Sequence, residues 1–511
     1  MHQAKPPLVA VIGTTGVGKT DLGVELAKAL SSRASPPKHG EILNHDSMQC
    51  YRGLDVITNK ATAEEMQGVP HHLMGFLEPG EEWGVNEFLR DALDKIEDLQ
   101  RRDAVPVAVG GTTYYLQNLV FPNQLVNDVS SRANSPEPSF TGPALVPEPR
   151  TLADVAHFPP SLLHSISSLP PESLALFLAL PALPSISSPS DLPPSFPLAL
   201  LPPRLRSPET LVPALYSLLQ ALDPASAARW HWRDVRKVRR ALEIVWEGRR
   251  WEDVREEQQR RPSEGPRFRT LIFWLYAEND ALHPRLDRRV DKMLDRGLLD
   301  EIDRLWEIAN APGAEPTDYS KGIYQAIGYK EFSPYLSLAH RSPTLTLEMS
   351  PELRALFNEG IRTMKTSTRQ YAKRQVKWIK GKLLPAVRAA QEDGEDVEVV
   401  LLDASDLSRW EERVQQPAID ILHKFLDCEP LPAPASLSAA AAMHLAQTTA
   451  SSASLTKRSC PTCTHDLARP FMVEERQWDA HLLTKAHKMA GRKRDKRAKR
   501  VIGGGPGDGA Q

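Results

Sequence analysis

Eight residues near the start of the chain have the types and spacing needed to hold a polyphosphate. They fit the phosphate-loop pattern G-x-x-x-x-G-K-[ST] and read Gly13-Thr14-Thr15-Gly16-Val17-Gly18-Lys19-Thr20. Backbone N–H groups around Gly16 and Gly18, with the N-terminus of a following helix, would bind phosphate oxygens. Lys19 adds a mobile positive charge, and the Thr20 hydroxyl is a ligand for Mg²⁺. The pattern predicts a phosphate site without saying which compound binds or whether ATP is hydrolysed.

A second polar run, Asp46 to Tyr51, follows the short strand expected at Glu41–Leu43. Ligand sites in open α/β sheets lie at the carboxyl ends of strands, so we expect Asp46 beside the phosphate loop. Its carboxylate could hold Mg²⁺ or act as a general base, and it could equally cap a following turn. The strand expected at Val105–Val109 ends in Gly110-Gly111-Thr112, so it lacks the metal-binding aspartate of an ordinary NTPase.

Four residues near the C-terminus have the types and order of a structural zinc site. The pattern is Cys460-x2-Cys463-x17-His481-x5-His487, which offers two thiolates and two imidazoles. Together with Trp478-x2-His481 it resembles the matrin/U1-type zinc finger of RNA-associated proteins. The basic segment after it, residues 491–500, predicts RNA binding or nuclear import.

These residues must be positioned by strands and helices that alternate in the first part of the chain. The alternation predicts an α/β fold, with a P-loop NTPase-like parallel sheet core, a helical insertion and a small C-terminal zinc finger. The predicted parts are a first core segment 7–121, a Pro/Ser-rich insertion 122–235 that is partly helical or disordered, and a second core segment 236–405 whose helices carry basic residues. They are followed by a linker region 406–456, the finger 457–490 and a basic, then Gly-rich tail 491–511.

Composition limits the class of protein. The chain has 511 residues, 44 prolines, four cysteines and a net charge of −2, which indicates two or three domains and long proline-rich stretches. Four cysteines are too few for a disulfide framework, so a reducing compartment fits. No run is long and apolar enough for a membrane span, and the start leads directly into the first core strand. We expect a monomer in the cytoplasm, with mitochondrial and nuclear pools.

Eight segments in order carry a resemblance to a known family. They read GTTGVGKT, DSMQCYRGLDVITNK, HHLMGFLEP, GGTTYYLQNLV, RRALEIV, HPRLDRRVDKMLDRGLLDEI, GIYQAIGYKEF and TRQYAKRQVKWIK, and they cover most of residues 8 to 385 outside the insertion. In this respect the chain resembles the tRNA dimethylallyltransferases (tRNA isopentenyltransferases) of the eukaryotic type. The resemblance implies transfer of a dimethylallyl group from dimethylallyl diphosphate to N6 of the adenosine 3′-adjacent to the anticodon in tRNA, with release of diphosphate.

The resemblance also assigns roles to residues. Asp46 corresponds to the base that accepts a proton from the adenine amine, which is a poor nucleophile on its own. Lys19, Thr20 with Mg²⁺, Arg289 and the loop from Gly13 to Thr20 would stabilise the leaving diphosphate. Taken alone, Arg289 would be read as a solvated helix charge.

The acceptor adenosine cannot react while stacked and would be flipped into the site. Basic clusters are usually solvated faces, but two of them around a phosphate site favour RNA binding. The tRNA-binding residues implied by the resemblance are Asp46, Ser47, Met48, Gln49, Thr112, Arg236, Lys237, Val238, Arg239, Arg240, Gln325, Gly328, Tyr329, Lys330, Lys373, Arg374, Gln375, Lys377, Trp378 and Lys380.

Two other functions remain open at the level of sequence. A P-loop small-molecule kinase would use the same phosphate loop, although the absent strand-end aspartate argues against it. A catalytically inactive RNA-binding protein would keep the basic segments, although Lys19, Asp46 and Arg289 are all present.

Overall fold

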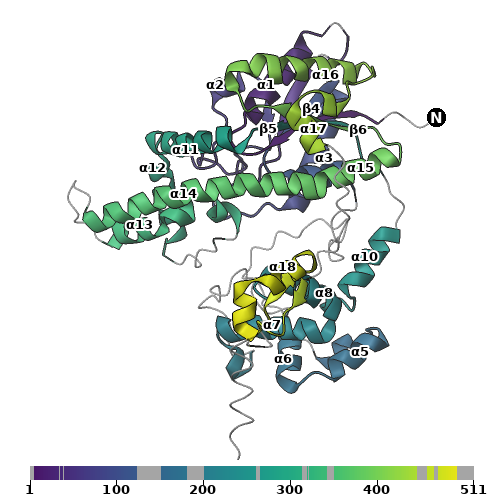
Figure 1. Ribbon diagram of the computed structural model, residues 1–511, viewed down its shortest axis with the longest axis vertical. Helices are drawn as coiled ribbons and strands as arrows, with labels where there is room; N and C mark the ends of the chain where they lie inside the picture. Colours follow the sequence, from purple (N-terminus) through teal and green to yellow (C-terminus); the bar gives the residue numbers. More distant parts are fainter. Residues whose placement is uncertain are drawn as a thin grey trace, which may run out of the picture. The chain divides into compact units, whose positions relative to one another are not determined.

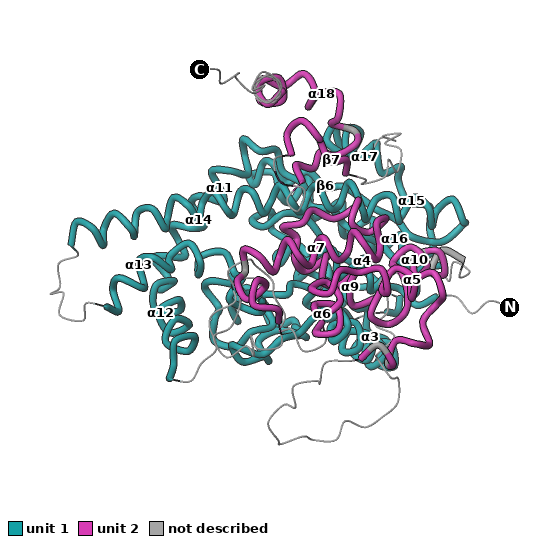
Figure 2. Tube along the Cα trace, turned by 90° about the horizontal axis from the view of Figure 1, so that it is seen from below, with its two compact units in different colours: residues 1–127, 263–448 teal, residues 128–262, 449–511 magenta. Residues whose placement is uncertain are grey.

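The computed structural model describes residues 5–33, 35–37, 39–122, 151–180, 201–260, 265–312, 319, 321–341, 350–445, 457–464, 466 and 470–491. The chain forms two compact units, residues 1–127 with 263–448 and residues 128–262 with 449–511 (Figure 2). No helix of the described residues is both long enough and apolar enough to cross a membrane.

A six-stranded sheet forms the centre of the first unit, and all of its strand pairs are parallel. The order is β3-β2-β4-β1-β5-β6. The bounds are β1 Pro7–Gly13, β2 His39–Asn44, β3 His71–His72, β4 Ala104–Val109, β5 Arg269–Tyr276 and β6 Val397–Asp403. Val11 of β1 pairs with Val109 on one side and Phe273 on the other, so the phosphate loop begins at a central strand. The predicted α/β fold with a parallel sheet is confirmed.

Helices cover both faces of this sheet because the apolar residues of the strands alternate between them. In β1, Leu8, Ala10 and Ile12 belong to one hydrophobic cluster, whereas Val9 and Val11 belong to another. The first cluster includes residues of α3 (Val85–Arg101), α4 (Thr113–Val120), α15 (Leu384–Glu392) and α17 (Ala439–Leu445). The second includes residues of α1 (Lys19–Ser31) and α16 (Gln416–Leu426). The short α2 (Ala63–Met66) contacts α1.

Four further helices of this unit lie at the carboxyl end of the sheet. They are α11 (Asn279–Asp295), α12 (Leu298–Ala309), α13 (Tyr329–Arg341) and the long α14 (Pro351–Trp378) (Figure 1). Ser350 caps α14 by accepting the N–H of Leu353. The ion pairs Arg369–Asp287 and Lys365–Asp291 join α14 to α11, at 3.0 and 2.5 Å. The helix α11 is thereby held along α14, which matters for the site below.

Six of the α-helices described for the second unit lie between residues 160 and 260, and the first five of these share a hydrophobic core. Their bounds are α5 Pro160–Ser167, α6 Pro171–Ala179, α7 Pro208–Leu222, α8 Pro224–Arg229, α9 Val235–Trp246 and α10 Trp251–Arg260. Four of them begin with proline, which suits the first turn of a helix because no N–H is needed there. The proline-rich composition of the insertion therefore builds helix starts in its described part. Residues 123–150 and 181–200 of the predicted insertion lie outside the described residues.

Two predicted boundaries are corrected. The second core segment was expected from residue 236, but α9 belongs to the helical unit because Val238, Leu242 and Val245 are buried in its core. The region 406–456 was expected as a linker, but α16 and α17 pack against the sheet through residues such as Ile421 and Ala441. Residues 446–456 lie outside the described residues.

The described residues near the C-terminus form a small module. Its elements are β7 (Lys457–Ser459), β8 (Met472–Glu474) and α18 (Trp478–Leu483), and the two strands pair antiparallel. The predicted tail, residues 492–511, lies outside the described part of the chain.

Candidate active site

The phosphate loop joins β1 to α1 in the conformation that its glycines allow. Gly16 and Gly18 have φ of 79° and 90°, in the left-handed region that disfavours residues with a Cβ. Gly18 is the N-cap of α1, so the first N–H groups of the helix are directed out of the loop. Lys19 Nζ donates a hydrogen bond to the Thr14 carbonyl at 2.8 Å. The predicted loop residues, Gly13 to Thr20, therefore form a continuous turn between β1 and α1, and a turn of this conformation suits an anion.

Two cations and one carboxylate influence one another at this loop. Burial lowers the pKa of Lys19 to about 8; the negative charge of Asp46 opposes this change and the positive charge of Arg289 adds to it. Burial likewise lowers the pKa of Arg289 to about 10, although the negative charge of Asp46 raises it. Two partly desolvated cations in one place make a site that gains from binding a polyanion. Arg289 lies on α11, as its predicted role requires.

Asp46 is fixed by a turn directly after β2. Its backbone N–H donates to Asn44 Oδ1, and its Oδ1 accepts the N–H of Met48, both at 3.0 Å. The capping role considered from sequence is therefore real, but it uses only one carboxylate oxygen. Oδ2 accepts no hydrogen bond from the described residues and lies 2.9 Å from where a Cβ on Gly111 would stand. Glycine at 111 lets the β4 turn approach this oxygen closely.

The neighbours of Asp46 are also held in place. The Ser47 N–H donates to Thr112 Oγ1 at 3.1 Å, and the two hydroxyls lie 3.2 Å apart. Gln49 Nε2 donates to the carbonyls of Thr58 and Asn59 at 3.3 and 3.1 Å. Thr112 thus lies beside the Asp46 turn, but it is not among the residues that line the cavity next to this turn.

These groups surround one cavity of about 540 Å³. The phosphate loop, Asp46 to Gln49, Arg289, Gln325 and Lys330 all contribute to its wall. One stripe of α14 forms another part of the wall, with residues spaced by three or four positions: Met364, Thr368, Tyr371 and Gln375. A single cavity therefore contains the phosphate loop, the carboxylate and an apolar region, which includes Ile57 and Met293.

Two residues of this stripe, Tyr371 and Gln375, make contacts that the sequence analysis did not predict. Tyr371 lies near Asp46, and burial followed by the Asp46 charge raises its pKa, so its hydroxyl stays protonated. Gln375 was assigned to tRNA, yet its side chain is only 5% exposed. Its Oε1 accepts the Thr15 N–H at 2.9 Å, and its Nε2 donates to the Gly111 carbonyl at 3.0 Å. The helical spacing on α14 was the available signal for both.

The other predicted tRNA-binding residues fall into three groups. Gln325, Lys330, Lys373, Arg374, Lys377 and Lys380 are exposed in the first unit, and Trp378 is half-buried, donating to Gln117 Oε1 at 3.2 Å. The side chains of Val238 and Tyr329 are buried, and Gly328 has none, so contacts at these positions would come from the backbone. On α9 in the second unit, Arg236 and Lys237 are exposed, whereas Arg239 and Arg240 pair with Glu243 at 3.0 and 3.4 Å.

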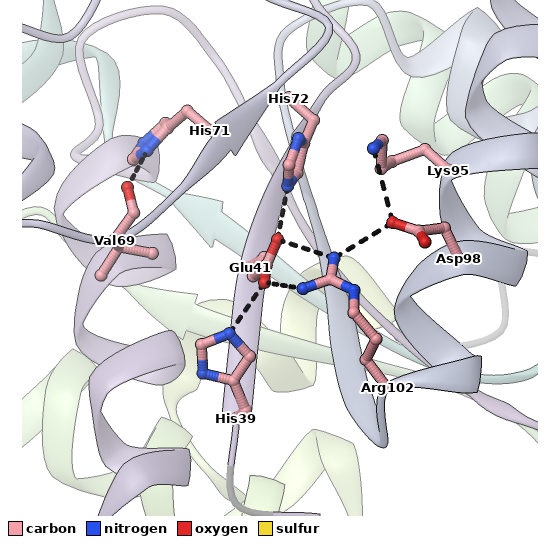
Figure 3. A network of polar contacts seen from close by, with 8 residues as sticks. All are labelled: His39, Glu41, Val69, His71, His72, Lys95, Asp98 and Arg102. Atoms are coloured by element: carbon pink, nitrogen blue, oxygen red, sulfur yellow. Dashed lines mark hydrogen bonds and ion pairs between the residues drawn. The ribbon is translucent and has the colours of Figure 1, made fainter.

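A polar network around the buried Glu41 joins the strands that lead to the Asp46 turn (Figure 3). Glu41 of β2 contacts His39, His72 and Arg102 at 2.8, 2.5 and 2.9 Å. Burial by itself raises the pKa of Glu41, but hydrogen bonds from Arg102, His72 and His39 outweigh it and lower the pKa to about 2. The network joins β3 to β2 through the contact of His72 with Glu41. Asn44 Nδ2 donates a further hydrogen bond to the Leu73 carbonyl at 2.8 Å.

The four predicted zinc ligands converge in the C-terminal module. Their ligand atoms lie within 4.8 Å of one another. Cys460 Sγ and Cys463 Sγ lie 3.4 and 3.5 Å from His487 Nδ1, and Cys463 Sγ lies 3.6 Å from His481 Nε2. A tetrahedral zinc site has sulfur–nitrogen edges of about 3.5 Å, from its usual bond lengths. The residues therefore fit a structural zinc ion.

Comparisons with known proteins agree with this arrangement. The model of the family described as IPP transferase matches residues 49–141 and 201–382. The chain is 34% identical to the tRNA dimethylallyltransferase of Schizosaccharomyces pombe over 97% of both chains. It is 31% identical to that of Homo sapiens over 94% of this chain and 85% of the relative. A solved structure titled as snapshots of a eukaryotic dimethylallyltransferase acting on tRNA matches 97% of this chain and 99% of its own, with a TM-score of 0.66 and 28% identity. On these matches, the chain belongs to the IPP transferase family.

Proposed function

We propose that this protein transfers a dimethylallyl group from dimethylallyl diphosphate to N6 of the adenosine 3′-adjacent to the anticodon in tRNA, releasing diphosphate. The observation that carries the proposal is that the Asp46 carboxylate and the two cations Lys19 and Arg289 share one cavity. A carboxylate beside an anion-binding loop suits a reaction in which a diphosphate leaves and a proton is removed. The names of the relatives supply the donor and acceptor classes.

The diphosphate end of the donor would lie on the phosphate loop. Loop N–H groups, Lys19 and Arg289 would each contact its oxygens. Negative charge on the diphosphate grows as the allylic C–O bond breaks, so these groups act most strongly in the transition state. The apolar part of the cavity suits the five-carbon chain and limits access of water to the allylic centre.

Asp46 would accept the proton at the other end of the reaction. The N6–C bond forms as the C–O bond breaks, the diphosphate departs with the electron pair, and the amine proton moves to Asp46 Oδ2. The capping bond at Oδ1 fixes the carboxylate, so the second oxygen stays directed at the amine. The adenosine must leave its stack to reach this oxygen.

Two metals belong to the proposal. The Thr20 hydroxyl lines the cavity at the start of α1 and would hold Mg²⁺ together with the diphosphate oxygens. When bound, Mg²⁺ would neutralise part of the charge on the diphosphate. Zn²⁺ would be held by the Cys460 cluster and would stabilise the C-terminal module.

The exposed basic residues support tRNA as the acceptor. Lys373, Arg374 and Lys377 lie on one segment of α14, and Arg374 also lines the cavity. Arg236 and Lys237 give α9 a second exposed basic segment. Contacts of this kind would bind phosphates of the RNA backbone, and those on α14 would hold the anticodon arm at the cavity.

The test is to incubate the full-length protein with labelled dimethylallyl diphosphate and unmodified tRNA, and then digest the tRNA to nucleosides. The expected product is one adenosine per tRNA that carries the label on N6. A tRNA in which the adenosine beside the anticodon is replaced by guanosine is the matched control and should remain unlabelled. Phosphate transfer from ATP to a small molecule, with no labelled nucleoside, would favour a kinase instead.

A further inference from the structure

A tryptophan outside the cavity packs against the phosphate loop. Trp410 lies between the turns Leu407–Arg409 and Glu411–Gln415. A Cβ built on Gly18 would lie 2.6 and 2.9 Å from two ring carbons of Trp410, so the ring is in contact with the Gly18 backbone. Trp410 is not among the residues that line the cavity. The ring therefore touches the loop and not the space for ligands.

The ring and its segment are held from two sides. Trp410 Nε1–H donates to the Glu25 carboxylate of α1, at 3.1 and 3.2 Å from its two oxygens. Arg285 of α11 donates to the carbonyls of Ala404 and Ser405 at 2.9 and 2.7 Å. The helix α1 begins with Lys19, and α11 carries Arg289. The segment 404–410 is thus tied to both helices that supply cations to the cavity.

Gly18 needs such support because of its conformation. Its φ of 90° is open to glycine, but a glycine also moves easily to other conformations. The ring packs directly against the Cα of Gly18 and so restricts the movement of the loop at this residue.

We infer that Trp410 is a positioning residue for the phosphate loop, which strengthens diphosphate binding by ordering Gly18. The inference rests on the proposed function for the identity of the ligand. It adds a part of the chain beyond residue 382, where the match to the family model ends.

The test measures binding of inorganic diphosphate with Mg²⁺ to the full-length protein by calorimetry, without tRNA. Trp410→Ala should raise the Kd for diphosphate about tenfold, the effect of freeing roughly one backbone residue. The kcat of Trp410→Ala at saturating dimethylallyl diphosphate should change much less than its KM for dimethylallyl diphosphate. Trp410→Phe keeps a ring against Gly18 while losing the bond to Glu25, and should restore most of the affinity. Diphosphate binding does not require prenyl transfer, so the result is separate from the test of the proposed function.

Trp306→Ala is the matched control, because Trp306 is a half-buried tryptophan of the same unit that stacks on His340 with centroids 3.8 Å apart. It should lower the Tm without changing the Kd. The inference is overturned if Trp410→Ala binds diphosphate as tightly as the wild type, or if Trp306→Ala weakens binding equally. Should Trp410→Ala not fold, Trp410→Leu takes its place with the same expectations.

Discussion

The side chain of Gln375 accepts the backbone N–H of Thr15 at 2.9 Å, although 360 positions separate the two residues. Its amide donates to the Gly111 carbonyl at 3.0 Å. One buried side chain of α14 therefore connects the phosphate loop to the turn that packs against Asp46. In the proposed reaction, this connection would set the separation between the diphosphate and the proton acceptor.

Gln375→Ala should lower kcat/KM for dimethylallyl diphosphate by roughly 5- to 150-fold, because leaving buried partners unsatisfied costs about 1–3 kcal/mol. Both kcat and KM should change, since the loop and the Asp46 turn would each lose a contact. Steady-state kinetics check this. Gln416→Ala is the control, because Gln416 bonds Asp420 on the exposed surface. Unchanged kcat/KM in Gln375→Ala would mean that the connection has no role in the reaction.

The depressed pKa of Lys19 predicts a pH dependence of donor binding. Its pKa is about 8 in the free protein, chiefly through burial, so the ammonium loses its proton as the pH rises through that value. The KM for dimethylallyl diphosphate should therefore rise above about pH 8, by up to about tenfold per pH unit. Lys19→Arg keeps the charge and should remove the rise. A KM that stays constant to about pH 9.5 in the wild type would contradict this assignment.

The Glu41 network predicts a pH dependence of stability. The pKa of Glu41 is lowered from 4.5 to about 2 on folding. Its contribution is therefore fully present above the unfolded pKa and is lost as the pH falls from about 4.5 toward about 2. Glu41→Gln should lower the free energy of unfolding at neutral pH by roughly 2–4 kcal/mol, because Arg102 and His72 lose a charged partner.

Urea unfolding of the wild type and Glu41→Gln measures this difference. The exposed Glu97 offers a matched control, and Glu97→Gln should unfold like the wild type. The difference in free energy of unfolding between Glu41→Gln and the wild type should shrink as the pH is lowered below about 4.5. A difference that stays constant down to about pH 2.5 would show that the charge of Glu41 does not contribute.

Local patterns in the sequence predicted much of the fold and part of the site. The phosphate loop and the position of Asp46 after β2 each depend on residues that are close in sequence. The role of Arg289 was predicted from the family resemblance, because its local sequence indicated only a solvated helix charge. The hydrogen-bond partners of Gln375 could not be predicted, because Thr15 and Gly111 lie in the turns after β1 and β4, far from α14 in sequence. Because Gln375 lies among basic residues, its sequence suggested contact with RNA. Its position on α14 instead directs the side chain into the interior.

The predicted boundaries of the insertion and of the linker were wrong for a related reason. Proline and serine in the insertion indicated weak structure, yet in its described part proline begins helices such as α7 and α8. The segment after β6 has little strand or helix periodicity before Gln416, so the contact of Trp410 with Gly18 gave no local signal. Such contacts depend on the tertiary fold.

The zinc module should depend on its metal. Its described residues bury few apolar side chains, among them Cys460 and Val473, while structural zinc contributes roughly 10–16 kcal/mol in such small domains. A zinc-selective chelator, added in the presence of excess Mg²⁺, should therefore unfold the module, weaken binding of full-length tRNA and leave kcat on an anticodon stem-loop unchanged.

Metal analysis, circular dichroism and kinetics on both RNAs check this. Cys463→Ala should reproduce the effect of the chelator, whereas Cys428→Ala, at an exposed cysteine outside the cluster, should not. Absence of stoichiometric zinc, or loss of kcat on the stem-loop, would contradict the division between a catalytic unit and a metal-dependent module.

The central claim is that Asp46 removes the amine proton while the adjacent cations hold the diphosphate. The most direct measurement is the single-turnover rate of Asp46→Asn with saturating dimethylallyl diphosphate and tRNA, beside the Kd values for both. Asparagine keeps the size and the Oδ1 cap but is a poor base, so the rate should fall by roughly 10²–10⁴-fold while both Kd values stay within about threefold. A near-normal rate, or a rate loss explained by weaker binding of either substrate, would contradict the claim.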